Sequence, residues 1–136
     1  TDQLAKEIKS RFPQNRLYGY PDSSGGARST NASKTDIQIL ESYNISNQSG
    51  ASNPSIKDSV NNVQRLLCNG KDEVNLFVHP RAKNVIDSLD LQSYTESGEP
   101  EKTGLDHFSD CVRYLCWRCF NPLHLGAGRK TGIRIY

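Results

Sequence analysis

Five stretches of the chain carry hydrophobic residues three and four positions apart, the spacing of one face of an α-helix. The clearest begins at Asn53 and Pro54, an N-cap and a first-turn proline, and ends at Gly70. Another begins at Ser33, where Asp36 three residues later completes a weak capping box. The five predicted helices cover residues 2–12, 33–43, 53–70, 80–89 and 104–119.

Short β-rich segments separate these helices. Residues 16–20 and 73–79 are predicted strands, the second because hydrophobic and other side chains alternate along it. We expect a hairpin or surface loop over residues 90–103, and a flexible tail over 121–136 that includes a candidate edge strand. Strands separated by helices predict an α/β domain.

Composition narrows the class of protein only slightly. The chain has 136 residues, enough for one domain of ordinary size, and its net charge of +2 is too small to indicate a polyanionic partner. It has no long apolar run, which predicts a soluble protein without a membrane span. Three of its four cysteines fall within one helical pattern and do not form a disulfide framework, which favours a reducing, cytoplasmic compartment.

The last predicted helix carries the candidate chemistry. Asp106, His107 and Asp110 fall on one arc, because they are spaced i, i+3 and i, i+4. Two carboxylates and an imidazole on one face suit an oxygen-preferring divalent cation such as Mg²⁺ or Mn²⁺. A helix start with Thr103 as N-cap, or a solvated face, explains the same residues without a metal. The apolar stripe of this helix is expected to comprise Leu105, Phe108, Val112, Leu115 and Cys119.

A glycine-rich segment, "PDSSGGARSTNASK" at 21–34, is the second candidate. It is expected to be a loop that follows a strand, with Asp22 at the end of that strand. Asp22 is a candidate metal ligand or, alternatively, a residue that caps its own turn. Arg28 and Lys34 flank the loop and are candidate contacts to DNA phosphates, although isolated basic side chains are mostly just solvated.

Taken in order, five segments resemble the C-terminal nuclease domain of the large terminase subunit of tailed bacteriophages. They are "YPDSSGGARST", "SKTDIQIL", "NPSIKDSVNNVQRLL", "VHPRAKNVIDSL" and "GEPEKTGLDHFSDCVRY". The resemblance covers roughly residues 1–120. It implies an RNase H-like α/β fold with a mixed sheet flanked by helices, and a single, partial domain spanning 1–136.

The resemblance also implies a function and a site. The family's enzymes cut concatemeric double-stranded DNA during packaging by a two-metal phosphodiester hydrolysis with Mg²⁺ or Mn²⁺. Asp22 and Asp110 correspond to metal-binding catalytic acids, His107 to an auxiliary ligand or proton carrier, and Asp106 to a further ligand. The implied partners are DNA, the portal protein and the small terminase subunit, and the implied location is the cytoplasm of a bacterial host carrying a phage or prophage.

The chain departs from the family pattern at its start. The first catalytic aspartate of RNase H-like nucleases lies on an opening strand, and this chain begins in what is predicted to be the following helix. The expectation is therefore an N-terminally truncated domain with weak or no cutting activity. The P-loop sequence of the family's ATPase motor does not occur in the chain.

Two further interpretations stay open. One is a non-catalytic module that binds DNA or a packaging partner through basic side chains at Arg81, Lys83, Arg129, Lys130 and Arg134. The other is a zinc-stabilised module in which Cys116, Cys119 and His124 supply ligands, with a fourth from Cys68 or Cys111. The cysteine pair falls within a predicted helix rather than a turn, which argues against zinc.

Overall fold

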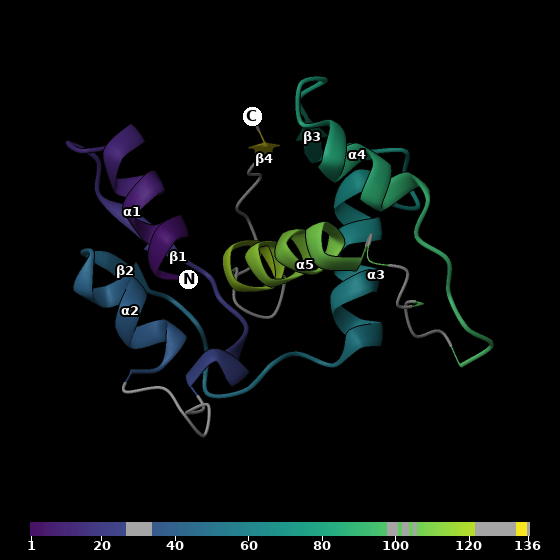
Figure 1. Ribbon diagram of the computed structural model, residues 1–136. Helices are drawn as coiled ribbons and strands as arrows, with labels where there is room; N and C mark the ends of the chain where they lie inside the picture. Colours follow the sequence, from purple (N-terminus) through teal and green to yellow (C-terminus); the bar gives the residue numbers. More distant parts are fainter. Residues whose placement is uncertain (27–33, 98–100, 102–103, 105, 122–132, 136) are drawn as a thin grey trace. The chain divides into compact units, whose positions relative to one another are not determined.

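The computed structural model describes residues 1–26, 34–97, 101, 104, 106–121 and 133–135 (Figure 1). The chain divides into two compact units, Thr1–Asn53 and Pro54–Tyr136. The helices are α1 (Asp2–Arg11), the short 3₁₀ helix η1 (Ser23–Gly26), α2 (Asp36–Ser42), α3 (Ile56–Leu67), α4 (Lys83–Asp90) and α5 (Asp106–Phe120). The strands are β1 (Leu17–Gly19), β2 (Ile45–Asn47), β3 (Leu76–Val78) and β4 (Ile133–Ile135).

In the first unit, α1 and α2 pack together and α2 also contacts β2 and η1. The strands β1 and β2 pair in parallel, with Leu17 opposite Ile45. Ile45 and Ala5 are its buried hydrophobic side chains among the described residues. A Cβ atom at Gly19 would lie 3.3 Å from Cγ2 of Ile45, which is closer than most real contacts. Glycine at this position therefore allows the two strands to approach.

The predicted starts of α2 and α3 are wrong, and hydrogen bonds show why. Thr35 caps α2, because its Oγ1 accepts from the backbone N–H of Gln38 and the Gln38 side chain accepts from the N–H of Thr35. This reciprocal pair is a full capping box, whereas the predicted cap, Ser33, lies outside the described residues. Ser55 rather than Asn53 caps α3, accepting from the N–H of Asp58.

The second unit is built around α5, which packs against both α3 and α4 (Figure 1). Its hydrophobic core joins side chains from two helices and one strand: Val63, Leu66, Leu76, Val112 and Cys116. Strand β3 contacts α3 and pairs in parallel with β4, with Leu76 opposite Ile133. Helix α4 begins at Lys83, three residues after Pro80, which was the predicted start.

The buried face of α5 differs from the predicted stripe. Val112 is buried as expected, but Phe108 is 42 % exposed, and Leu115 and Cys119 are only partly buried. Leu105 lies outside the described residues. The buried residues of α5 are Ser109, Val112, Arg113 and Cys116. The side that packs inward therefore carries polar as well as apolar side chains. The prediction failed because it placed only apolar residues inside, whereas hydrogen bonds to neighbouring helices allow Ser109 and Arg113 to be buried.

The predicted α/β class is confirmed, with α-helices and short strands in both units. Among the described residues the strands form two separate two-stranded parallel sheets, β1–β2 and β3–β4. No helix in the described part of the chain is both long and apolar enough to cross a membrane. Part of the segment expected to be a loop after β1 is the single turn of η1.

Candidate functional site

The first half of α5 presents the predicted metal-binding side chains near the surface of the second unit. His107 is exposed, and Asp106 and Asp110 are each partly exposed. Oδ1 of Asp106 accepts a hydrogen bond of 3.0 Å from the backbone N–H of Gly104, immediately before the helix. Asp106 is the first residue of α5, an acid in the first turn as the non-metal interpretation expects, whereas Thr103, the N-cap in that interpretation, lies outside the described residues.

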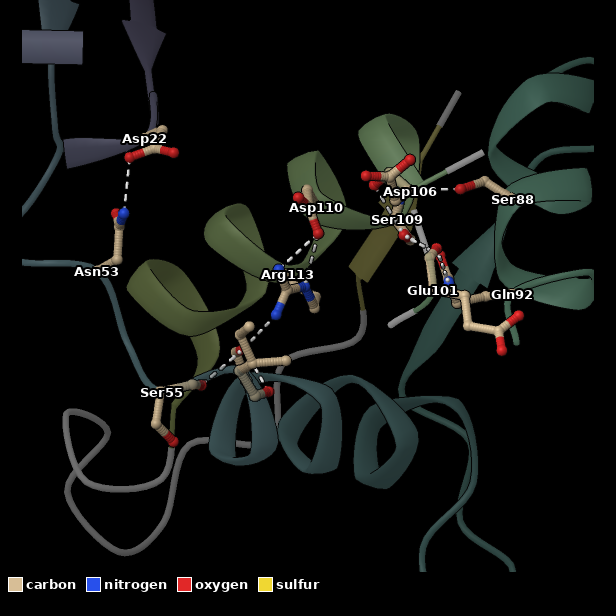
Figure 2. Close-up of polar contacts among 12 residues, drawn as sticks. Asp22, Asn53, Ser55, Ser88, Gln92, Glu101, Asp106, Ser109, Asp110 and Arg113 are labelled. Carbon is tan, nitrogen blue, oxygen red and sulfur yellow. Dashed lines mark hydrogen bonds and ion pairs between the residues drawn. The ribbon is translucent and has the colours of Figure 1, made fainter. Parts of the chain in front are cut away.

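Asp110 is bound by an arginine one turn along the same helix. Nε and Nη2 of Arg113 both donate to Oδ1 of Asp110, at 3.1 and 2.5 Å (Figure 2). The two side chains differ in exposure, because Arg113 is 8 % exposed and Asp110 is 32 % exposed. The buried arginine thus holds one oxygen of the carboxylate, Oδ1. No described residue hydrogen-bonds the second oxygen, Oδ2.

Arg113 is itself anchored to α3. Its Nη1 donates to Oγ of Ser59 at 3.0 Å, and Ser59 is 1 % exposed. The Ser59 hydroxyl also lies within hydrogen-bond distance of the carbonyl oxygens of Ser55 and Ile56, to which it donates. The guanidinium is therefore fixed at both ends, by a carboxylate on its own helix and by a hydroxyl on a neighbouring one.

A second polar contact fixes the beginning of α5 against α4. Ser88, which is fully buried, accepts a hydrogen bond of 2.9 Å from the backbone N–H of Ser109 (Figure 2). The Ser109 hydroxyl lies 3.2 Å from Oε1 of Gln92, and Gln92 in turn donates to the carbonyl oxygen of Glu101. These contacts hold the turn that carries Asp106 and Asp110.

The carboxylates of this surface are the ligand type that Mg²⁺ and Mn²⁺ prefer. Mg²⁺ in proteins is commonly held by one or two carboxylates together with water and substrate phosphates, rather than by a complete protein cage. On the metal hypothesis Asp110 would supply one such carboxylate, and Asp106 and His107, earlier on the same helix, would be the neighbouring donors. The described residues contain no group of three or more His, Cys, Asp or Glu side chains arranged to hold a metal ion.

Asp22 lies in the first unit and serves as a turn residue there. Its Oδ1 accepts hydrogen bonds from the backbone N–H of Ser24 at 2.7 Å and from Nδ2 of Asn53 at 2.6 Å. Its backbone carbonyl accepts from the N–H of Gly25, which closes η1. Asp106, His107 and Asp110 lie in the second unit. The meeting of Asp22 with these residues at a shared ion stays a prediction.

The basic residues proposed to contact DNA are exposed where they are described. Lys34 precedes α2, and Arg81 and Lys83 lie at the beginning of α4. The backbone N–H of Arg81 donates to Nδ1 of His79, which orders the turn before α4. Arg28, Arg129 and Lys130 lie outside the described residues, as does the side chain of Arg134.

The cysteines of α5 differ in environment. Cys116 is fully buried in the core. Its desolvation and, to a smaller extent, the charge of the neighbouring Cys119 raise the pKa of its thiol to about 12. Partial desolvation and, to a smaller extent, the negative charge of Asp110 also raise the pKa of the Cys111 thiol. A higher pKa favours the neutral thiol, whereas a cysteine must ionise to bind a metal. The environments of Cys111 and Cys116 therefore disfavour zinc binding. His124, the remaining candidate zinc ligand, lies outside the described residues.

Sequence reasoning missed Arg113 and Ser59. The i, i+3 spacing of Asp110 and Arg113 is visible in the sequence and is typical of an ion pair on a helix. The contact to Ser59, 54 positions away, depends on how α3 and α5 pack, which no local pattern reveals. Comparisons with protein-family models, with curated proteins and with solved structures found no match.

Proposed function

We propose that the chain belongs to the RNase H-like nuclease domain of a phage-type terminase large subunit and takes part in metal-dependent cleavage of double-stranded DNA. The observation that carries this proposal is the surface of α5, where partly exposed Asp110 leaves Oδ2 unbonded among the described residues, beside Asp106 and His107. The resemblance of five ordered segments supports it, as does the α/β class of the fold.

Each side chain has a distinct part in the proposal. Asp110 would be one carboxylate that holds the ion, and Asp106, one turn earlier, would be a second. His107, which is exposed, exchanges protons with solvent or completes the ligand set. A ligand role for Asp22 is what the resemblance implies, and it stays a prediction. An ion held there would supply activation of a water molecule and stabilisation of negative charge on the leaving oxygen.

Two measurements test this proposal together. Binding of Mn²⁺ is followed by electron paramagnetic resonance, and nicking of supercoiled plasmid is followed with Mg²⁺ or Mn²⁺. We expect Asp110→Asn to weaken Mn²⁺ binding and to abolish any cutting, and Asp22→Asn to weaken binding as well. Asp87→Asn is the matched control, because Asp87 is an exposed acid on α4 outside the proposed site.

The binding measurement keeps the proposal testable even if cutting is weak. A folded wild-type chain that binds no Mn²⁺ and cuts no DNA contradicts the proposal. The same conclusion follows if Asp87→Asn and Asp110→Asn have equal effects. Loss of binding in Asp110→Asn without any effect of Asp22→Asn contradicts only the role given to Asp22.

A second candidate function is DNA binding without cleavage. It is favoured by the Asp110–Arg113 ion pair, which already neutralises the carboxylate, and by the exposure of Arg81 and Lys83 at the beginning of α4. Gel-shift experiments at two salt concentrations, with and without Mg²⁺, distinguish this function. Metal-independent binding that weakens steeply with salt, and that Arg81→Gln/Lys83→Gln reduces, supports it.

A further inference from the structure

We propose that Asn69 is a site of spontaneous covalent modification in the folded chain, where its side chain closes onto the backbone nitrogen of Gly70 and the asparagine becomes aspartate or isoaspartate. The turn that carries it joins α3 to β3 within the second unit. The backbone N–H of Asp72 donates to the carbonyl oxygen of Asn69 at 3.0 Å, which closes the turn. The proposal does not depend on the nuclease function.

The sequence places the two reacting groups next to each other. Asn69 and Gly70 are the one Asn-Gly pair of the sequence. In such a pair the backbone nitrogen of the glycine can attack Cγ of the asparagine and close a five-membered imide ring. Glycine has no Cβ atom, so no side chain shields the attacking nitrogen. Gly70 is exposed, and a Cβ atom placed there would contact no described residue within 4 Å apart from its chain neighbours.

Hydrogen bonds fold the Asn69 side chain over the backbone that follows it. Its Oδ1 accepts from the backbone N–H of Lys71 at 2.9 Å and from the backbone N–H of Glu73 at 3.0 Å. Its Nδ2 donates to Oε2 of Glu73 at 2.8 Å. A side-chain carbonyl bonded to the N–H two residues further along is bent back over the intervening backbone, here that of Gly70. The amide is therefore held on the side of the turn where the ring closes.

The same two donors favour the reaction electrostatically. When the Gly70 nitrogen adds to Cγ of Asn69, negative charge develops on Oδ1, the atom to which both backbone N–H groups already donate. Backbone N–H groups that face a developing oxyanion lower the barrier to attack on a carbonyl carbon. Hydrogen bonds to a charged acceptor are also stronger than those to a neutral one. The hydrogen bonds of the turn therefore favour ring closure.

The reaction needs only water as a co-reactant. The Gly70 nitrogen forms a bond to Cγ of Asn69, the Cγ–Nδ2 bond breaks, and Nδ2 leaves as ammonia with the proton lost by Gly70. Water then adds to either carbonyl of the imide. Opening at Cγ gives aspartate, whereas opening at the backbone carbonyl of residue 69 gives isoaspartate, in which the chain runs through the former side chain. Both products add a carboxylate beside Glu73 and remove the donor to its Oε2.

Incubation of the folded chain at neutral and at mildly alkaline pH tests the proposal. Digestion at mildly acidic pH, which suppresses further conversion, and tandem mass spectrometry quantify aspartate and isoaspartate at position 69. We expect progressive conversion that is faster at the higher pH, because the attacking nitrogen must lose its proton. Asn84, which lies within α4 and precedes a valine, is the internal control and should stay unchanged in the same digest.

Gly70→Ala is the matched variant. The backbone of Gly70 is outside the left-handed region and a Cβ atom has room, so the variant should fold, which circular dichroism checks. Its methyl group should slow conversion at Asn69 several-fold. Incubation of the wild type in urea removes the two hydrogen bonds to Oδ1, and the folded chain should convert at least as fast as this unfolded one.

The comparison of folded and unfolded wild type requires no variant, so the proposal stays testable if Gly70→Ala does not fold. Slower conversion in the folded chain than in urea overturns the proposal, because the hydrogen bonds of the turn would then protect Asn69. A folded Gly70→Ala variant that converts as fast as the wild type also overturns it, since the attack would not depend on access to the nitrogen of residue 70.

Discussion

Arg113 and Asp110 lie one turn apart on α5, and the guanidinium that binds the carboxylate also reaches Ser59 on α3. The ion pair therefore contributes to packing between helices as well as within one. Helix-surface pairs of the same spacing contribute little, because water competes for both partners. Here the arginine is buried, and its loss removes the donor that it offers to the Ser59 hydroxyl and the Asp110 carboxylate.

Replacing Arg113 by methionine is expected to lower the free energy of unfolding by about 1–3 kcal/mol, the usual cost of leaving a buried polar partner unsatisfied. Urea unfolding followed by circular dichroism measures the change. The control is Arg11→Met, which removes an exposed ion pair and should cost about 0.3–0.5 kcal/mol. Equal losses in the two variants would show that burial of Arg113 adds nothing to stability.

Because Val112 and not Phe108 lies on the inward face of α5, truncating the smaller side chain should cost more stability than truncating the larger one. Val112→Ala should lower the free energy of unfolding by about 2 kcal/mol, because Val112 is 5 % exposed and contacts the core. Phe108→Ala removes a larger side chain but should cost less, since Phe108 is 42 % exposed. Thermal unfolding of both variants measures the difference. A larger loss of stability in Phe108→Ala would show that Phe108 is buried, as the sequence analysis expected.

The capping box at the beginning of α2 predicts a local effect. Thr35→Ala removes the acceptor for the N–H of Gln38 and should destabilise the chain by about 1 kcal/mol. Ser33→Ala, at the cap expected from the sequence, should change stability much less. Chemical unfolding of the two variants decides between the two positions. The larger loss in Ser33→Ala would place the cap at Ser33 instead.

The buried thiol of Cys116 predicts alkaline destabilisation. Its pKa is raised from 9.0 to about 12 in the folded chain, so the unfolded chain releases this proton at lower pH. The contribution to stability is complete below pH 9, and falls as the pH rises from 9 toward 12, by up to about 1.4 kcal/mol per pH unit. Unfolding of the wild type and of Cys116→Ala across this range isolates the effect. Parallel curves would contradict it.

Local patterns in the sequence were sufficient to predict the helices and most strands. The stripe of Val60, Val63 and Leu67 predicted α3, and the alternation around Leu76 and Val78 predicted β3. Helix starts were less predictable, because several polar residues near Thr35 and Ser55 compete as caps. Only the hydrogen bonds of the folded chain distinguish these candidates.

The candidate site shows a different limit of sequence reasoning. Asp106, His107 and Asp110 were singled out from their spacing, and all three are at least partly exposed on α5, but their joining in one site stays a prediction. The roles of Arg113, Ser59 and Ser88 were not recognisable, because each depends on a partner on another helix. A buried arginine within an apolar stripe also contradicts the usual assumption that charged positions mark the solvent face.

The parallel pairing of β3 with β4 has a consequence for the order of folding. Ile133, the partner of Leu76, follows α4 and α5 in the chain. During synthesis, β3 can therefore pair with β4 only after both helices have left the ribosome. Pairings between distant segments form slowly, because the intervening chain must first be brought together. During synthesis, the packing of α3, α4 and α5 is therefore expected to precede completion of this sheet.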